Sequence, residues 1–516
     1  MSKRRALWGC GALLLTAAAC SDAHTRNEQA SERQRERPGS SRSAAKPSTP
    51  ATEEMMQPTA AAPKPPTKSA DPPSTAQPPD PPADKPEEQP EDTPAKPAPI
   101  SEWRMMGYDV GSTYFNRTET RLTKANAGQL KIAWQANMDG NVYGAPLQVG
   151  SMIYASGPKD IRALEAETGK ELWRVAQGST SSLSFADGTL FLNTYEGKIL
   201  ALQASDGKML WYRAHDSQPT DGLSSVIPSG DLLLVGGSNG GRELTGEPFS
   251  GYVAALDRKT GEQRWRALTA PSGSHGVSVW STPSVDERAG RVFASTGNNF
   301  GAPASNTSDA ILSFKLEDGA IVWINQRVKN DIWDIRVPSP DADFGANPVL
   351  YETMVAGKPT KLVAAGSKAG QVHAVGRDDG VLVWTRTLCE GGSDGSRGIY
   401  LNTSWSGKYV LVACNQGGPA TLLALDGATG DMVWQRQLAE SVWSRISIAN
   451  GVGFLGSGPE LVAFDTDTGE IIARYPSKKG TVAGTITVAN GRVAFGEGLT
   501  WASGLAGNTL TVLTVP

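Results

Sequence analysis

The chain has 516 residues and a nearly balanced charge, with 49 Lys and Arg against 53 Asp and Glu and a formal net charge of −4 at pH 7. This balance argues against a nucleic-acid-binding protein, which needs a basic surface to meet phosphates. Only four His occur, widely separated in the chain, so a zinc site built from His is not expected.

The first 20 residues have the pattern of an export signal. A basic start at Lys3, Arg4 and Arg5 precedes an apolar stretch that is too short to span a bilayer. Three Ala then lead to Cys20, which resembles the processing site of bacterial lipoproteins. The resemblance implies that Cys20 is lipidated and that the protein is exported and lipid-anchored at the outer membrane. An ordinary cleaved secretion signal is the alternative.

Residues 21–100 are rich in Pro, Ala, Lys, Glu and Ser and have almost no branched apolar side chains. Such a segment cannot bury enough surface to offset the entropy of ordering it. We therefore predict a disordered, extended tether between the signal and a single folded domain at residues 101–516.

One phrase recurs seven times in that domain: a small residue, an apolar residue, a few polar residues, Gly, and Trp four positions later. The first copy runs from Ala163 to Gly169 with Trp173, and the seventh, from Ala463 to Gly469, lacks the Trp. Successive Gly are 38 to 61 residues apart, enough for four strands, which is typical of propeller blades. The Gly of each copy are Gly169, Gly207, Gly261, Gly319, Gly380, Gly430 and Gly469.

The two ends of the domain add one more blade to these seven. Trp134 has the character of an outer strand but no turn phrase before it, while strands after Thr481 have no outer strand following them. Pairing the two ends leaves no free sheet edge. We therefore predict an all-β, eight-bladed propeller whose last blade is closed by an N-terminal strand. A closed ring needs no partner to cover an edge, so a monomer is expected.

Two cysteines, Cys389 and Cys414, remain in the folded domain. Export leads to an oxidising compartment, so a disulfide between them is expected, with two buried thiols as the alternative. The sequence has no Cys-x-x-Cys-His motif, so any electron acceptor would be a separate molecule.

Three stretches in the longer middle blades are unusual. In the first, Trp280 is expected to begin an inner strand, and a Thr-Gly-Asn follows at Asn298. This stretch resembles the quinoprotein alcohol dehydrogenases, especially their polyvinyl alcohol dehydrogenase branch. The resemblance implies that Trp280 forms the floor under pyrroloquinoline quinone (PQQ). It also implies that Asn298 ligates Ca²⁺ and that Ser278 hydrogen-bonds the cofactor. Core packing for Trp280 and a turn for Asn298 are the alternatives.

The second stretch contains two carboxylates on alternate residues, Asp341 and Asp343, which project to the same side of an extended segment. The resemblance makes Asp341 the catalytic base and Asp343 a metal ligand. A Trp-Asp pair just upstream leaves Asp334 as a rival base, and a solvated acidic loop is the alternative to both.

The third stretch places Lys368 where the family has a cation that hydrogen-bonds the quinone oxygens; a surface charge is the alternative. Together the three imply oxidation of an alcohol by hydride transfer to PQQ, with a divalent cation and an Asp base.

Several family positions differ in this chain. Glu243 fits a metal-ligand position only with a one-residue shift, Tyr143 stands where a cofactor-touching Glu is usual, and Tyr400 lies in a phrase that replaces a Gly-Gly-Ile-x-Trp. The adjacent-cysteine disulfide of many members is absent from the sequence. The competing interpretation is a non-enzymatic propeller lipoprotein that binds partners, similar to the outer-membrane protein assembly factor.

Overall fold

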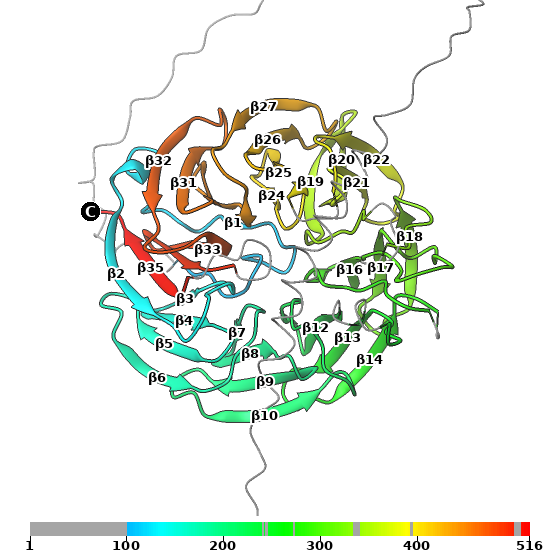
Figure 1. The fold of residues 1–516 in the computed structure, drawn as a ribbon, viewed down its shortest axis with the longest axis horizontal. Helices are drawn as coiled ribbons and strands as arrows, with labels where there is room; N and C mark the ends of the chain where they lie inside the picture. Colours follow the sequence, from blue (N-terminus) through cyan, green and yellow to red (C-terminus); the bar gives the residue numbers. More distant parts are fainter. Residues whose placement is uncertain are drawn as a thin grey trace, which may run out of the picture. The chain divides into compact units, whose positions relative to one another are not determined.

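Eight β-sheets arranged around a common centre make up the folded domain in the computed structural model (Figure 1). The structure describes residues 101–239, 242, 246–271, 274–333, 341–392, 396–499 and 507–516. The predicted signal, Cys20 and the predicted tether lie outside these residues. The prediction of an all-β, eight-bladed propeller is confirmed.

The first four blades follow chain order and each pairs four consecutive strands. Blade one has β3 (Leu147–Val149), β4 (Met152–Ser156), β5 (Ile161–Glu165) and β6 (Glu171–Val175); blade two has β7 (Ser184–Ala186), β8 (Thr189–Asn193), β9 (Lys198–Gln203) and β10 (Met209–Ala214). Blade three has β11 (Ile227–Ser229), β12 (Leu232–Gly237), β13 (Tyr252–Asp257) and β14 (Gln263–Leu268); blade four has β15 (Ser284–Asp286), β16 (Arg291–Ser295), β17 (Ala310–Lys315) and β18 (Ile321–Gln326).

Blades five to seven continue the ring. Blade five has β19 (Val349–Val355), β20 (Lys358–Gly366), β21 (Gln371–Gly376) and β22 (Leu382–Thr387); blade six has β23 (Arg397–Gly398), β24 (Thr403–Trp405), β25 (Tyr409–Gln416), β26 (Ala420–Asp426) and β27 (Met432–Gln437). Blade seven has β29 (Ser447–Ala449), β30 (Val452–Ser457), β31 (Glu460–Asp465) and β32 (Ile471–Pro476), with β1 (Phe115–Asn116) added in parallel to β29.

Blade eight joins the two ends of the domain, as the sequence predicts. It contains β33 (Val482–Ala489), β34 (Arg492–Glu497) and β35 (Thr509–Thr514), with β28 (Trp443–Ser444) parallel to β33. The N-terminal strand β2 (Lys131–Asn137) pairs antiparallel with β35, and Figure 1 shows the cyan and red strands side by side. A short 3₁₀ turn, η1 (Ala127–Gln129), precedes β2. This pairing closes the ring and covers the edge of β35.

The recurring Trp side chains join neighbouring blades through the recurring Gly. In each case the indole of one blade lies against the turn Gly of the next, so a Cβ atom added to Gly319 would come within 2.5 Å of Trp265. Gly319 has a φ of 74°, which Gly adopts without strain. The Nε1 of Trp265 donates to the Leu316 carbonyl at 3.0 Å. The predicted structural role of these Trp, including an indole partner, is confirmed for this pair.

The seventh phrase lacks its Trp because blade eight has no turn phrase to receive it. Ala473 stands at the Trp position, four residues after Gly469. The next outer strand is β2, which comes from the other end of the chain. Instead, η1 packs against β32, and the Tyr475 hydroxyl donates to the Ala127 carbonyl at 2.5 Å. A large side chain at position 473 therefore has no turn Gly on which to dock.

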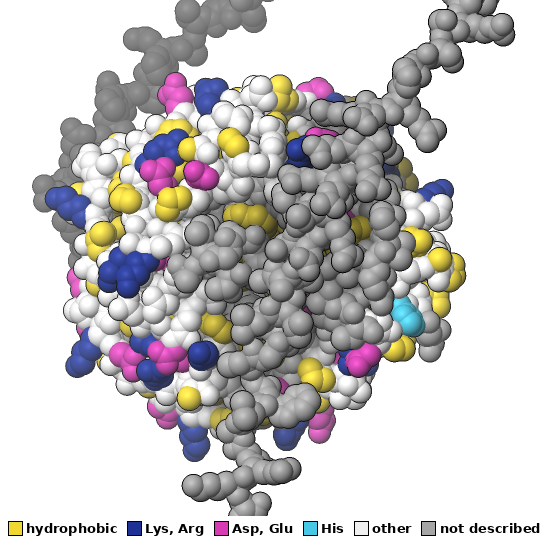
Figure 2. All heavy atoms as spheres, viewed as in Figure 1, with side chains coloured by type: hydrophobic (Ala, Val, Ile, Leu, Met, Phe, Trp, Pro, Cys, Tyr) yellow, Lys and Arg dark blue, Asp and Glu magenta, His cyan; other side chains and the backbone are white. Residues whose placement is uncertain are grey.

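Among the described residues, no helix is long and apolar enough to cross a membrane. Figure 2 shows Lys, Arg, Asp and Glu interspersed around the rim of the visible face.

Candidate active site

Four segments from blades four and five meet at one face of the ring. Ser278 and Trp280 precede β15, Asn298 follows β16, Asp343 precedes β19, and Lys368 follows β20. β15 and β16 pair antiparallel, as do β19 and β20. The segment before the first strand of each hairpin therefore lies at the same end of the hairpin as the segment after its second strand. Trp280 lies four residues before β15, so the expectation that it begins an inner strand is wrong. The innermost strand is short and its approach is a loop.

The Lys368 ammonium is bound by both predicted carboxylates. Its Nζ donates to Asp341 Oδ1 at 2.9 Å, to Asp341 Oδ2 at 3.0 Å and to Asp343 Oδ2 at 3.0 Å. The two carboxylates therefore point to one side of their segment, as their alternate spacing predicts. The side chain of Asp341 is only 1% exposed, so this cluster is largely removed from water.

Burial changes the protonation of both partners. Burial raises the pKa of Asp341 to about 7, against the opposing effect of the Lys368 ammonium and with a smaller upward effect of Asp343. Burial alone would lower the pKa of Lys368, but the charges of Asp341 and Asp343 outweigh it and raise that pKa well above its ordinary value. Lys368 is therefore a cation at neutral pH, whereas Asp341 exchanges a proton near pH 7.

Three aromatic rings surround the ammonium. Lys368 Nζ lies 5.4 Å from the ring centroid of Trp280, 5.9 Å from that of Trp333 and 5.7 Å from that of Tyr400. All three distances are within the range of a cation–π attraction, which is stronger where water is excluded. Trp280 also packs against a buried cluster that includes Tyr143, Tyr400 and Trp443.

Asn298 is held against the carboxylate pair. Its backbone N–H donates to Asp343 Oδ1 at 2.6 Å, and its side-chain Nδ2 donates to the carbonyls of Asn299, at 2.8 Å, and Trp333. Both hydrogen bonds of the amide nitrogen therefore go to backbone carbonyls and not to a carboxylate. Gly297 makes the close approach possible, because a Cβ there would lie 2.9 Å from Asp343 Oδ1.

The residues that the resemblance assigns to PQQ fit such a group. The hydroxyl of Ser278 and the Nε1 of Trp280 are buried and have no hydrogen-bond partner in the described part of the chain. An unpaired buried donor is unfavourable, and a ligand rich in acceptor oxygens would satisfy the Ser278 hydroxyl. The Trp280 N–H lies in the plane of its ring and does not point toward a ligand stacked on the ring face. The partly exposed Trp280 ring offers a stacking surface and Lys368 a cation.

A divalent metal ion does not fit the described residues in the same way. They contain no group of three or more His, Cys, Asp or Glu that could hold a metal ion. Both oxygens of Asp343 already accept hydrogen bonds, from Asn298 N and from Lys368 Nζ. The predicted ligand Glu243 lies outside the described residues, as does the rival base Asp334.

Two further carboxylates are buried near the cluster, and no motif or spacing in the sequence predicts them. Asp331 accepts from the backbone N–H of Trp333 at 3.0 Å and of Ala342 at 2.8 Å. Asp309 is fully buried, and within the part of the chain that the structure describes neither of its carboxyl oxygens has a hydrogen-bond partner. Burial, followed by the charges of Asp343, Asp331 and Asp341, raises the pKa of Asp309 well above its ordinary range. Burial therefore favours the protonated form of Asp309.

Trp333 and Tyr400 are further site residues that sequence reasoning did not assign to the site. Trp333 appeared only as part of a rival motif, and Tyr400 only as a departure from a family phrase. Cys389 and Cys414 form a disulfide bond that closes the segment containing Tyr400.

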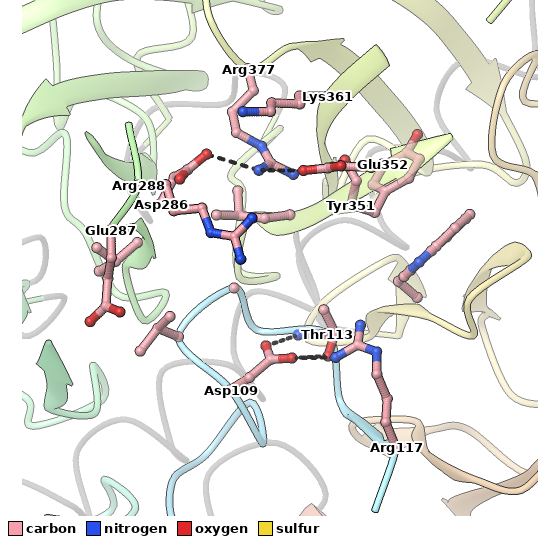
Figure 3. A pocket seen from close by; sticks show the side chains of 15 residues that line it. Asp109, Thr113, Arg117, Asp286, Glu287, Arg288, Tyr351, Glu352, Lys361 and Arg377 are labelled. Atoms are coloured by element: carbon pink, nitrogen blue, oxygen red, sulfur yellow. Dashed lines mark hydrogen bonds and ion pairs between the residues drawn. The ribbon is translucent and has the colours of Figure 1, made fainter. Parts of the chain in front are cut away.

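A separate cavity of about 480 Å³ lies at the other end of the same hairpins (Figure 3). Its lining includes Glu287 and Arg288 in the β15–β16 turn, and Glu352 and Lys361 in the β19–β20 hairpin. None of the predicted site residues lines it. Its more buried charges are paired, as in Arg377 Nη1 with Asp286 Oδ2 at 2.9 Å. The Lys368 cluster is the stronger candidate site, because it combines a carboxyl with a raised pKa, a buried cation and, on the neighbouring Ser278, an unpaired hydroxyl.

The sequence is similar to those of several known proteins. The family model described as outer membrane protein assembly factor BamB matches residues 87–183, 126–330, 368–471 and 421–514. A polyvinylalcohol dehydrogenase from Pseudomonas sp. is 27% identical over 468 residues, covering 78% of this chain and 72% of that relative. A quinohemoprotein alcohol dehydrogenase from Comamonas testosteroni is 21% identical over 399 residues, covering 66% of this chain and 53% of that relative.

Solved structures share the fold at lower identity. The crystal structure of the Comamonas testosteroni quinohemoprotein alcohol dehydrogenase has a TM-score of 0.67 at 17% identity, with 80% of each chain covered. BamB from Moraxella catarrhalis has a TM-score of 0.54 at 16% identity, covering 75% of this chain and 99% of that one.

Proposed function

Because the chain belongs to the propeller family described as outer membrane protein assembly factor BamB and is a quinoprotein alcohol dehydrogenase-like propeller, we propose that it oxidises an alcohol with bound PQQ. The observation that carries the proposal is the Lys368 ammonium held between Asp341 and Asp343 beside the Trp280 ring. A scaffold needs no buried, proton-exchanging carboxylate next to a cation and unpaired donors.

In this proposal each residue has a distinct role. Trp280 provides the surface on which the planar quinone stacks, and Ser278 and Lys368 donate hydrogen bonds to its oxygens. Asp341 accepts the hydroxyl proton of the alcohol at a carboxylate oxygen. The quinone, when bound, supplies the hydride acceptor.

The ion pair lets Asp341 take up that proton without leaving a buried charge unpaired. When Asp341 becomes neutral, Lys368 keeps an ionic partner in Asp343, 3.0 Å away. An unpaired ammonium in this site would be costly. Proton uptake is therefore compatible with the buried position of Lys368. We assign no step to a cation, because both oxygens of Asp343 already accept hydrogen bonds. A cation held by Asp343 would have to displace these hydrogen bonds.

The test is reconstitution of the purified mature protein with PQQ, with and without Ca²⁺, followed by dye reduction with primary, secondary and polymeric alcohols. Wild-type protein should reduce the dye, and Asp341→Asn should lose about 10²- to 10⁴-fold in rate, as expected for a lost general base. Equal rates for the two proteins would contradict the proposed base.

A second candidate function is a partner-binding scaffold. The observation that favours it is the match of the BamB model together with Tyr143 at a position where a cofactor-touching Glu is usual. A scaffold would bind no quinone, and Asp341→Asn would leave partner binding unchanged.

The proposal also places the protein outside the cytoplasm, lipid-anchored at the outer membrane through Cys20, with a separate electron acceptor. Its support is the basic start, the short apolar stretch and the Ala run before Cys20.

A further inference from the structure

The turn that carries Lys368 is compact and is attached to the acidic segment. Gly370 N donates to Ser367 O at 3.0 Å, and Ser367 N donates to Gln371 O at 2.9 Å. Lys368 N donates to Asp343 O at 2.8 Å. The direction of the ammonium therefore depends on where this turn sits.

The segment closed by the disulfide lies directly against that turn. Cys389 follows β22 in blade five and Cys414 lies on β25 in blade six, so the bond joins two neighbouring blades. Leu388 N donates to Gly370 O at 2.8 Å, and Ile399 N donates to Ser367 O at 3.1 Å. The turn is thus held by backbone hydrogen bonds from Leu388, just before the disulfide-closed segment, and from Ile399 within that segment.

Glycine allows the two backbones to approach this closely. A Cβ added to Gly398 would lie 2.1 Å from Lys368 O, and one added to Gly391 would lie 2.6 Å from the same atom. A Cβ on Gly370 would lie 2.1 Å from Cys389 O. Contacts this short leave the turn no room to move toward the segment.

The same segment brings Tyr400 into the site. Its ring centroid lies 5.7 Å from Lys368 Nζ and 5.5 Å from the Trp443 ring, and its hydroxyl donates to Gly392 O at 3.4 Å. The Tyr400 carbonyl also faces Gly345, two residues after Asp343, where a Cβ would lie 2.5 Å away. One covalently closed segment therefore contacts the cation, an aromatic wall and the acidic segment.

We propose that the Cys389–Cys414 disulfide, through the segment that it closes, positions Lys368 and Tyr400 in the candidate active site. This inference rests on the proposed function for its catalytic consequence, but not for the positioning itself. The disulfide limits the freedom of the segment between blades five and six, and the segment in turn fixes the Lys368 turn. Cys389 and Cys414 are positioning residues, since neither sulfur contacts the ammonium.

The experiment compares the wild-type full chain with Cys389→Ser/Cys414→Ala and with Trp211→Phe, which perturbs blade docking in blade two. Without any ligand, hydrogen exchange should be at least about tenfold faster at the Lys368 and Ile399 amides of the cysteine variant. Exchange in blade two should not change in that variant, and Trp211→Phe should give the reverse pattern. Unchanged protection at Lys368 and Ile399 would overturn the proposal.

PQQ affinity, followed by quenching of Trp fluorescence, gives the catalytic consequence. We expect binding about 10- to 100-fold weaker in the cysteine variant, because small displacements of a positioned group have effects of that size. If wild-type protein binds no PQQ, the proposed function fails while the exchange data still decide the positioning. If wild-type protein binds PQQ and the cysteine variant binds it equally well, the positioning proposal fails alone.

Gly398→Ala keeps the disulfide and is the second test variant, to be used if the cysteine variant does not fold. Its Cβ would press on Lys368 O, and its φ of 95° is unfavourable for Ala. We expect the same faster exchange at Lys368 with the disulfide intact. Normal exchange and normal PQQ affinity in Gly398→Ala would contradict the contact on which the inference depends.

Discussion

At the level of single residues, the candidate active site holds several ionisable side chains that are buried away from water. Lys368 forms ion pairs with two buried carboxylates, Asp341 and Asp343, and two more carboxylates, Asp331 and Asp309, are buried near this pair. Asp331 accepts hydrogen bonds from backbone N–H groups, whereas the Asp309 carboxyl has no hydrogen-bond partner among the described residues and its pKa is raised well above the ordinary range. The arrangement keeps one base, Asp341, close to its transition between neutral and charged forms.

The pH dependence of the rate follows from that transition. Burial raises the pKa of Asp341 to about 7, so the carboxyl is protonated, and unable to accept a proton, below pH 7. We expect kcat/KM to fall about tenfold per pH unit below pH 7 and to level off above it. Steady-state rates from pH 5 to pH 9 check this, with Asp341→Asn as the control that loses the dependence. A rate that is flat through pH 7 in the wild-type protein would exclude Asp341 as the base.

Replacing Lys368 by a neutral residue tests whether its ion pairs stabilise the cluster. Lys368→Met should destabilise the fold by about 3 kcal/mol, because two carboxylates are left buried without a counter-ion. Acid should partly restore the stability by protonating them. Urea unfolding at pH 5 and pH 8 measures this, with Lys368→Arg as the charge-preserving control. The same stability for both variants at both pH values would show that charge is not what matters.

Part of the site could be predicted from local sequence. Asp341, Asp343 and Lys368 sit in short phrases, and alternate spacing of the two carboxylates fixes their common side. Trp333 and Tyr400 could not be assigned in this way, because they reach the ammonium from loops whose paths depend on how blades four, five and six pack. No periodicity or spacing in the sequence predicts the path of such a loop.

At the level of elements, the Trp of each outer strand docks on the turn Gly of the following blade. The repeat therefore encodes contacts between blades rather than within them. This also accounts for Ala473, whose neighbouring blade contributes no turn phrase. The sequence predicts the hairpins because both partners of the contact recur. It does not predict the long connections, which differ from blade to blade in length and composition.

A methyl group at the docking turn should weaken the contact between blades. In Gly319→Ala the new Cβ would lie 2.5 Å from the Trp265 ring, at a φ of 74°. We expect a loss of about 2–4 kcal/mol, the sum of overpacking and backbone strain. Gly290→Ala, at a φ of 63° with nothing within 4 Å, isolates the backbone part and should cost about 1 kcal/mol. Equal losses in chemical denaturation would mean that the Trp contact does not contribute.

At the level of the whole molecule, the ring of blades is closed by pairing of strands from the two ends of the folded domain. The β2–β35 pairing places the start of the folded domain next to its C-terminal strand, so no blade edge needs a partner. This closure could be predicted from the two ends of the domain. The N-terminal end supplies an outer strand that has no inner strands, and the C-terminal end supplies inner strands that have no outer strand.

The proposed lipid anchor has a direct test at this scale. Cys20→Ser should abolish incorporation of labelled palmitate and move the protein from the membrane fraction to the soluble exported fraction. The fold, read by circular dichroism, should not change, since residue 20 precedes the predicted tether. Retention of the label by Cys20→Ser would refute lipidation at this position.

Direct titration of PQQ into the purified protein by calorimetry tests the central claim. We predict one quinone per chain, with binding weakened by Trp280→Ala and by Lys368→Met, and unchanged in Gly290→Ala on the other end of the same blade. No heat of binding in the wild-type protein, or equal binding in all four proteins, would contradict a quinone site at the Lys368 cluster.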